Sequence, residues 1–397
     1  MKILCVNAGS SSLKYQVYEM PEERNLISGY VEKIGQSDSF WTIKVNGEKI
    51  KGEKYLKDHT EAAKVMVESL FSNNIISDIS EIKGIGHRVL HGGEKYSDSV
   101  LITDDVIRDI ESLTKLGPLH HPGNLAGIYS MKETFKDTPM VAVFDTAFHQ
   151  TMPKKNYIYP TPYSWYKDYG VRKYGFHGTS HKYITMKMKE ILGRDDINII
   201  NCHIGSGSSI ACVKNSNCYD TTMGLTPLDG LMMGTRSGSI DPSILEYVCK
   251  ESGKTISEIT NDLNKKSGFL GVCGEADCRD VENLVNEGNE LAKLAYEMYT
   301  DRVAKYIAEY YVELDANVDA IVFTAGIGEN GYLFRKKVIE KIKCLGITLN
   351  DEENEKIASF KDLHEGVISL SDSKIPVYVV PTNEEAMIIK DTYELIK

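Results

Sequence analysis

The sequence lacks the features that mark membrane, secreted and nucleic-acid-binding proteins. No apolar run approaches the roughly 20 residues that a membrane-spanning helix needs, and the N-terminus enters a strand-like segment without the basic-then-apolar pattern of a signal peptide. The 46 basic residues are outnumbered by 57 acidic residues, which disfavours nucleic acid or an anionic membrane as a partner. The eight cysteines include no CxxC pair, so we expect buried, reduced thiols. We therefore predict a soluble, cytoplasmic protein.

The length of the chain and the cluster of prolines near its middle predict two domains. Its 397 residues suffice for two or three domains, each with a core of its own. Strand-like runs alternate with helical segments, which indicates an α/β fold. Three prolines at 153–162 suggest the crossing between two halves. We expect a first domain at 1–150, joined by a C-terminal helix at 384–397, and a second domain at 151–383.

Hydrophobic periodicity predicts individual elements within these halves. Residues 82–89 and 140–144 are apolar runs that indicate buried strands, each followed by polar or glycine-rich sequence. A long helix is predicted from about 289 to 314. We expect its apolar face to contain Leu291, Leu294, Met298, Tyr306, Ile307 and Tyr310.

One phrase occurs twice in the chain: a run of strand-forming residues, a Gly/Ser turn and a second strand. The copies span 1–18 and 197–213. Glycine lets a backbone approach a ligand closely, and serine supplies hydroxyl donors. A single Gly/Ser hairpin is more often only a hairpin, and the first turn lacks the GxxxxGK[ST] spacing of a P-loop. Two copies, together with a third glycine-rich segment at 324–330 that follows a strand, predict that the chain binds a polyphosphate.

Several charged side chains lie in apolar or glycine-rich surroundings. Arg88 ends the strand at 82–89, and Arg236 and Arg279 are framed by glycines. A guanidinium in such a place can make planar, bidentate contacts to phosphate or carboxylate. A structural salt bridge is the alternative for each arginine. Asp145 follows the strand at 140–144, where functional carboxylates are found in α/β sheets.

Three further residues, Lys14, His177 and Glu384, are candidates for the functional site. Lys14, two residues past the first serine run, can reach a phosphate as a point charge, or it is a surface lysine. His177 precedes a second histidine by four residues, but no Glu follows it, so a zincin site is excluded. Thr382 and Glu385 fit a capping box, which leaves Glu384 free for another role.

The chain resembles the acetate kinase family from its first strand to its final helix. The matching phrases, in chain order, are NAGSSSLKY (7–15), GHRVLHGG (86–93), VAVFDTAFHQTMP (141–153), YGFHGTSH (174–181), MGTRSGSIDP (233–242), FTAGIGEN (323–330) and PTNEE (381–385). The resemblance implies two similar domains of the actin/Hsp70/sugar-kinase type with an active-site cleft between them. It also implies a homodimer that transfers the ATP γ-phosphate reversibly and in line to acetate, giving acetyl phosphate and ADP, with Mg²⁺ or Mn²⁺ as the metal.

The resemblance also implies residue roles. The catalytic residues would be Asp145, His177 and Arg236. Arg88 would bind the acyl carboxylate, and Asn7 and Glu384 would support the metal. The nucleotide would be held by Lys14, Ser10, Ser12, His203, Ile204, Gly205, Ser206, Gly207, Asp277, Cys278, Arg279, Gly326, Ile327, Gly328, Glu329 and Asn330. The shape of the acyl pocket would be set by Leu90, Leu119, Phe176 and Pro227.

Acetate has a pKa of about 4, by analogy with side-chain carboxyl groups, and is ionised at pH 7. No general base is then needed, so we expect Asp145 to orient the site or its metal. Leu90 lies two residues past Arg88, on the same face of a strand, and family members commonly carry Val there. The larger side chain predicts a pocket that prefers acetate to propionate.

Three residues depart from the family pattern: Ser206 stands for Asn, Ser239 for Asp and His121 for Asn. The departures bear on nucleotide binding and on the choice of phosphoryl donor more than on the reaction class. Acetate kinase is the leading hypothesis. A propionate kinase or another short-chain acyl kinase is second, and a non-catalytic actin-like ATPase module is a remote third.

Overall fold

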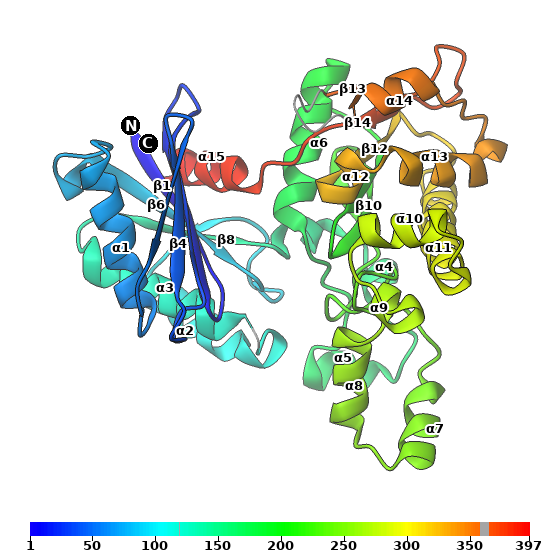
Figure 1. Ribbon diagram of the computed structural model, residues 1–397, viewed down its shortest axis with the longest axis horizontal. Coiled ribbons are helices and arrows are strands. Elements are labelled where there is room, and N and C mark those ends of the chain that lie inside the picture. The colour runs from blue at the N-terminus through cyan, green and yellow to red at the C-terminus, as the bar shows by residue number, and fades with distance from the viewer. Residues whose placement is uncertain (119, 358–364) are drawn as a thin grey trace. The chain divides into compact units, whose positions relative to one another are not determined.

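The computed structural model describes residues 1–118, 120–357 and 365–397, in two compact units (Figure 1). Unit 1 contains Met1–Gln150 and Asn383–Lys397, and unit 2 contains Thr151–Thr382. Each unit has a mixed sheet with helices packed on it, which confirms the predicted α/β class. Within the described ranges, no helix combines the length and the apolarity needed to cross a bilayer.

The sheet of unit 1 has the strand order β5-β4-β3-β2-β1-β6-β8-β7. Strands β1 to β5 form an antiparallel meander, β1, β6 and β8 run parallel, and β7 is antiparallel to β8. The strands are β1 (Lys2–Ala8), β2 (Ser12–Glu19), β3 (Arg24–Glu32), β4 (Phe40–Val45), β5 (Glu48–Glu53), β6 (Ile82–Val89), β7 (Val100–Leu101) and β8 (Met140–Phe144). The predicted strands at 82–89 and 140–144 are confirmed with these bounds.

Helices cover both faces of this sheet, as Figure 1 shows for α15 on one side and α1 and α3 on the other. Because side chains alternate along a strand, Leu4 and Val6 of β1 pack in the core with α1, whereas Ile3 and Cys5 pack against Ile388 of α15. The helices are α1 (His59–Ser72), α2 (Asp104–Ser112), α3 (His121–Thr134) and α15 (Glu384–Ile396).

The sheet of unit 2 has the order β11-β10-β9-β12-β14-β13. Strands β9 to β11 are antiparallel, and β9, β12 and β14 are parallel. The run β11-β10-β9-β12-β14 therefore repeats the pattern of β3-β2-β1-β6-β8 in unit 1, and the two predicted hairpins occupy equivalent places. The strands are β9 (Ile199–Ile204), β10 (Ser208–Lys214), β11 (Asn217–Thr221), β12 (Ala320–Thr324), β13 (Gly366–Val367) and β14 (Val377–Val379).

The long helix of unit 2 is present, but its predicted apolar face is wrong in part. Leu291, Leu294 and Met298 are 56%, 49% and 37% exposed. The buried stripe is shifted by one position and begins with Ala292 and Ala295, whose small side chains let the helix lie close to its neighbours. The helices are α4 (Lys154–Tyr157), α5 (Tyr163–Tyr169), α6 (Gly178–Leu192), α7 (Ser243–Ser252), α8 (Ile256–Lys265), α9 (Gly268–Cys273), α10 (Cys278–Asn286), α11 (Glu290–Glu313), α12 (Ala325–Asn330), α13 (Tyr332–Lys341) and α14 (Asp351–Ile357).

The predicted capping box of the last helix is also wrong. The N-cap of α15 is Asn383, whose side chain accepts a hydrogen bond from Ala386 N at 2.9 Å. An Asn side chain caps a helix as well as Thr does, so the cap lies one residue later than the pattern suggested. Glu384 and Glu385 are the first two residues of the helix.

Candidate functional site

Unit 1 holds an arginine–carboxylate pair at the ends of two neighbouring parallel strands. Arg88 lies near the end of β6, opposite Val143 of β8, and Asp145 follows β8 directly. Arg88 Nη2 lies 2.5 Å from Asp145 Oδ2, and the side chains are 19% and 2% exposed. The predicted acyl-binding arginine and the predicted catalytic carboxylate are therefore in direct contact.

Glu384 of α15 adds a second acidic group to this pair. Burial, reinforced by Asp145, raises the pKa of Glu384 to about 7 against the opposing effect of Arg88. For Arg88, burial lowers the pKa, but the charges of Asp145 and Glu384 outweigh burial and the net shift is upward. Arg88 Nε is buried and has no hydrogen-bond partner among the described residues. The buried Nε cannot itself meet a ligand, but the side chain is 19% exposed, so another part of the guanidinium is accessible to a further anion such as a carboxylate.

The first Gly/Ser turn lies beside this cluster. Lys14 is paired with Asn7 in the β1–β2 ladder, and its charge acts on the Glu384 carboxyl group. The side chains of Lys14 and Ser10 are exposed, and that of Ser12 is half-buried. Unit 1 therefore brings together the residues predicted for the metal and those predicted from the first turn.

The oxygen donors in this part of unit 1 suit Mg²⁺. Asn7 offers an amide oxygen and Glu384 a carboxylate, and Mg²⁺ takes oxygen ligands, commonly one or two carboxylates together with substrate phosphates. No group of three His, Cys, Asp or Glu side chains able to hold a metal occurs in the described part of the chain. A magnesium ion here would draw its remaining ligands from phosphate and water.

His177, Arg236 and the second Gly/Ser turn meet in unit 2. His177 is the N-cap of α6 with a φ of +57°, in the left-handed region that few residues other than glycine adopt. Its Nδ1 lies 2.9 Å from Ser209 Oγ, and its ring stacks on that of His203 with centroids 4.1 Å apart. A Cβ on Gly207 would lie 3.5 Å from both His177 Nε2 and Arg236 Nη1. The backbone of the turn therefore passes beside both groups.

Arg236 forms no ion pair with any described residue. Its Nη1 donates to Pro227 O at 3.3 Å and contacts Met233 Sδ at 3.7 Å. Burial lowers the pKa of Arg236, because the desolvated cation has no carboxylate to compensate it. The site in unit 2 thus contains a half-buried positive charge ready to meet an anion.

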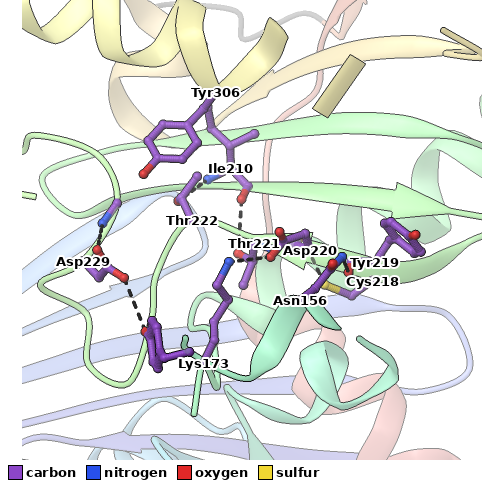
Figure 2. A network of polar contacts seen from close by, with 12 residues as sticks. Asn156, Lys173, Ile210, Cys218, Tyr219, Asp220, Thr221, Thr222, Asp229 and Tyr306 are labelled. Carbon is purple, nitrogen blue, oxygen red and sulfur yellow. Dashed lines mark hydrogen bonds and ion pairs between the residues drawn. The ribbon is translucent and has the colours of Figure 1, made fainter. Parts of the chain in front are cut away.

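A buried ion pair anchors the segment that leads to His177 (Figure 2). Lys173 Nζ lies 2.6 Å from Oδ1 of Asp220 on β11, and the side chains are 17% and 8% exposed. Burial lowers the pKa of Lys173, but Asp220 outweighs burial, so the net shift is upward. Lys173 precedes His177 by four positions, so the pair fixes the approach of the chain to α6.

Asp229 organises the loop that carries Arg236, and it appears beside the same network in Figure 2. Asp229 Oδ1 accepts hydrogen bonds from Ser239 Oγ at 2.6 Å and from Gly230 N at 2.9 Å. A hydroxyl at position 239 suits this contact, whereas an aspartate there would set two carboxylates against each other. The departure at Ser239 therefore supports the loop that carries Arg236.

Unit 2 also contains a cavity of about 730 Å³, which lies beside the second turn. The predicted nucleotide-binding residues that line it are Gly205, Ser206, Asp277, Cys278, Arg279, Gly326, Ile327 and Asn330. Sequence reasoning missed Phe269, Glu282 and Tyr332, which line it as well. Glu282 is four residues after Cys278 on α10, so helical spacing was the signal that places it on the same face.

The other residues predicted for the nucleotide in unit 2 do not line this cavity: His203, Ile204, Gly207, Gly328 and Glu329. Glu329 is 8% exposed, and its Oε1 accepts hydrogen bonds from Ala325 N at 2.8 Å and Thr382 N at 3.0 Å. Its carboxylate is directed at the backbone of its own unit.

The residues predicted for the acyl pocket are divided between the units. Leu90 is 4% exposed in unit 1, where it packs against Gly117. Phe176, 2% exposed, and the half-buried Pro227 belong to unit 2. Leu119 lies outside the described residues. His121, the departure two positions further on, is fully buried with Nδ1 2.9 Å from Ile110 O, so its role is to hold α2 and α3 together.

Comparisons with known proteins agree with this arrangement. The sequence model described as the Acetokinase family matches residues 2–390. The chain is 49% identical to the acetate kinase of Bacillus subtilis (strain 168) and 50% identical to that of Finegoldia magna, over 100% of each chain. It is similar to the crystal structure of Porphyromonas gingivalis acetate kinase, with a TM-score of 0.94, 44% identity and full coverage of both chains. A propionate kinase from Francisella tularensis gives a TM-score of 0.93 at 41% identity, over 99% of each chain. The chain belongs to the acetokinase family.

Proposed function

We propose that this protein transfers the γ-phosphoryl group of ATP reversibly to acetate, giving acetyl phosphate and ADP. One observation carries the proposal: each unit presents an arginine for an anion, and the two are prepared differently. Arg88 is fixed by a carboxylate and remains partly exposed, whereas Arg236 is unpaired beside a Gly/Ser turn. The first suits a small carboxylate substrate and the second suits a phosphoryl group.

The acetate side of the reaction needs orientation more than activation. Acetate is ionised at pH 7, since carboxyl groups of this kind have a pKa of about 4. One of its oxygens forms a bond to the γ-phosphorus while the bond to the bridging oxygen breaks, and ADP leaves with the electron pair. No proton is removed in this step. Asp145 therefore acts by holding the Arg88 guanidinium, which offsets the repulsion between acetate and the triphosphate.

On the phosphoryl side, Arg236 and His177 would stabilise the transferring group. The negative charge spreads over the equatorial oxygens as the phosphoryl group moves, so fixed cations and N–H donors lower the barrier. A Cβ built on Gly207 would contact both side chains, so the backbone of the turn passes close to them. The adjoining cavity of about 730 Å³ is large enough for a nucleoside.

Mg²⁺ fits the oxygen donors described above, with Asn7 and Glu384 as the residues that would hold it. When bound, the ion would neutralise phosphate charge. Glu384 would have to be ionised for that task, because a metal ligand must be deprotonated. We also propose a homodimer, which light scattering coupled to size exclusion tests directly.

The deciding experiment is an acyl phosphate trap. Purified protein is incubated with ATP, Mg²⁺ and hydroxylamine together with formate, acetate, propionate or butyrate, and hydroxamate and ADP are measured in parallel. We expect equal amounts of hydroxamate and ADP with acetate. ADP without hydroxamate would indicate an ATPase, and a higher kcat/KM with propionate would indicate the propionate kinase that the second structural relative suggests.

A further inference from the structure

We propose that Asn124 is a positioning residue that fixes the first Gly/Ser turn relative to the strand that carries Arg88. Asn124 lies on α3 and is 3% exposed. Its Nδ2 donates to Ala8 O at 2.8 Å, and its Oδ1 accepts from Leu90 N at 3.1 Å. One amide therefore joins the backbone at the ends of two strands.

These two contacts lie where the sheet itself no longer joins the strands. The parallel ladder between β1 and β6 ends with the pair Val6 and His87. Ala8 and Leu90 both lie beyond that pair. Beyond the ladder, the distance between the two strand ends is set by the side chains that lie between them. Here the Asn124 side chain forms a hydrogen bond to each strand end.

Helix α3 also packs directly against the turn. A Cβ on Gly123 would lie 2.6 Å from Gly9 C and O, and a Cβ on Gly127 would lie 2.5 Å from Ala8 Cβ. Both distances are shorter than any real contact allows, so the helix lies against the turn without spare room. Asn124, between these glycines, is placed by the same packing. His59 of α1 supports the turn as well, with Nε2 2.7 Å from Gly9 O.

The consequence for catalysis rests on the proposed function. Acetate on Arg88 and phosphate held near Asn7 react only at one separation, and an error of about 1 Å can cost on the order of 100-fold in rate. Asn124 ties Ala8, the residue after Asn7, to Leu90, two residues after Arg88. Loss of either hydrogen bond should lower kcat more than it weakens the binding of nucleotide in unit 2.

Asn124→Asp tests this role through pH. A protonated aspartic acid has the shape of asparagine: its carbonyl oxygen accepts from Leu90 N, and its hydroxyl donates to Ala8 O. An ionised aspartate has no donor, and it faces the Ala8 carbonyl oxygen. Because a buried carboxyl group resists ionisation, the variant should switch between the two forms within a workable pH range.

The measurement is the ratio of variant to wild-type kcat at each pH, which cancels titrations that both proteins share. We expect Asn124→Asp to be at least tenfold slower than wild type at pH 8 and to recover several-fold by pH 6, while Asn124→Ala stays slow throughout. The Kd for ADP should remain within about twofold for both variants. Ser130→Ala on the same helix, whose hydroxyl bonds to Ala126 O, is the matched control and should behave as wild type.

A ratio that does not change with pH, or a wild-type kcat for Asn124→Ala, would overturn the role of Asn124. These results differ from failure of the proposed function, which would appear as a wild-type protein that forms no acyl phosphate. If Asn124→Asp fails to fold at pH 8, the same measurement is made after folding at pH 6, and failure to recover activity there contradicts the inference.

Discussion

Arg88 and Arg236 are the same side chain in two opposite electrostatic settings. In unit 1, Arg88 contacts Asp145 at 2.5 Å and lies near the acidic Glu384, so its charge is compensated before any ligand arrives. In unit 2, Arg236 is half-buried with a carbonyl oxygen and a thioether sulfur as its contacts. An uncompensated, partly desolvated cation costs free energy in the folded protein.

The difference separates two tasks that one residue type can perform. A compensated guanidinium orients a substrate carboxylate without binding it so tightly that the ground state is favoured. An uncompensated guanidinium responds most strongly where negative charge develops, and catalysis depends on interactions that are stronger in the transition state than in the ground state. We therefore propose that Arg88 in unit 1 contributes to ground-state binding and that Arg236 in unit 2 stabilises the transition state.

Arg236→Ala gives the largest expected effect. Removing a fixed cation at the transferring phosphoryl group should lower kcat by roughly 100-fold or more, while the Kd for ADP changes little. Arg236→Lys keeps the charge but loses the planar fork, and it should recover part of the rate. The measurement is steady-state kcat together with ADP titration. A variant with near-normal kcat would remove Arg236 from the mechanism.

Arg88→Ala should act mainly on substrate binding. We expect the KM for acetate to rise about tenfold or more and the KM for ATP to stay nearly constant, because a carboxylate clamp contributes to one substrate only. The variant should also unfold at a lower temperature, since Asp145 is left buried without its cation. Arg236→Ala, which removes an unpaired cation, should not lower the unfolding temperature. Equal changes in both KM values would instead indicate a structural arginine.

The two arginines also show where sequence reasoning stops. Arg88 and Asp145 were identified from their positions at strand ends, and Arg236 from the glycines that flank it. Both patterns are local in the sequence. The sequence separation of 57 between Arg88 and Asp145 hides their contact, which arises from the parallel pairing of β6 and β8. The lack of a partner for Arg236 is a property of the whole of unit 2. It depends on the groups that the fold places around the guanidinium, which no spacing along the chain reveals.

The fold was more predictable than the packing. The bounds of β8 follow from five consecutive apolar residues, and the hairpins follow from the repeated phrase. On α11, however, the larger side chains drew the predicted face to Leu291 and Leu294, while the fold buries Ala292 and Ala295. Periodicity indicates that a helix is present, but the choice of buried stripe depends on which neighbours come close.

Leu90→Ala tests whether the surroundings of Arg88 also set the acyl length. Leu90 lies two residues after Arg88 and is buried against Gly117. Discrimination per substrate methylene is worth roughly 1–3 kcal/mol in a fitted apolar site. We expect wild type to prefer acetate over propionate by kcat/KM, and the variant to narrow that ratio several-fold. If Leu90 packs only in the core, the variant loses stability and the ratio stays the same.

The smallest effect is expected from a half-buried carboxyl group that lies outside both arginine sites. Glu313, at the end of α11, has an Oε2 with no hydrogen-bond partner among the described residues. Burial, with the nearby charges of Asp220 and Glu309, raises its pKa from 4.5 to about 7. Like Arg236, it is a partly desolvated ionisable group, but it has no proposed task in catalysis.

The sign of its pH effect follows from the raised pKa. Between pH 4.5 and 7 the folded protein holds a proton on Glu313 that the unfolded chain has released, so stability falls as pH rises through this window. Glu313→Gln stays neutral and escapes that loss. We expect the melting temperature of the variant to exceed that of wild type by about 2 °C at pH 8, with the difference vanishing near pH 5 and kcat unchanged. Glu297→Gln, at an exposed position of the same helix, is the control. A difference that does not change with pH would show that the Glu313 carboxylate is compensated in the folded protein, and would contradict the raised pKa on which this prediction rests.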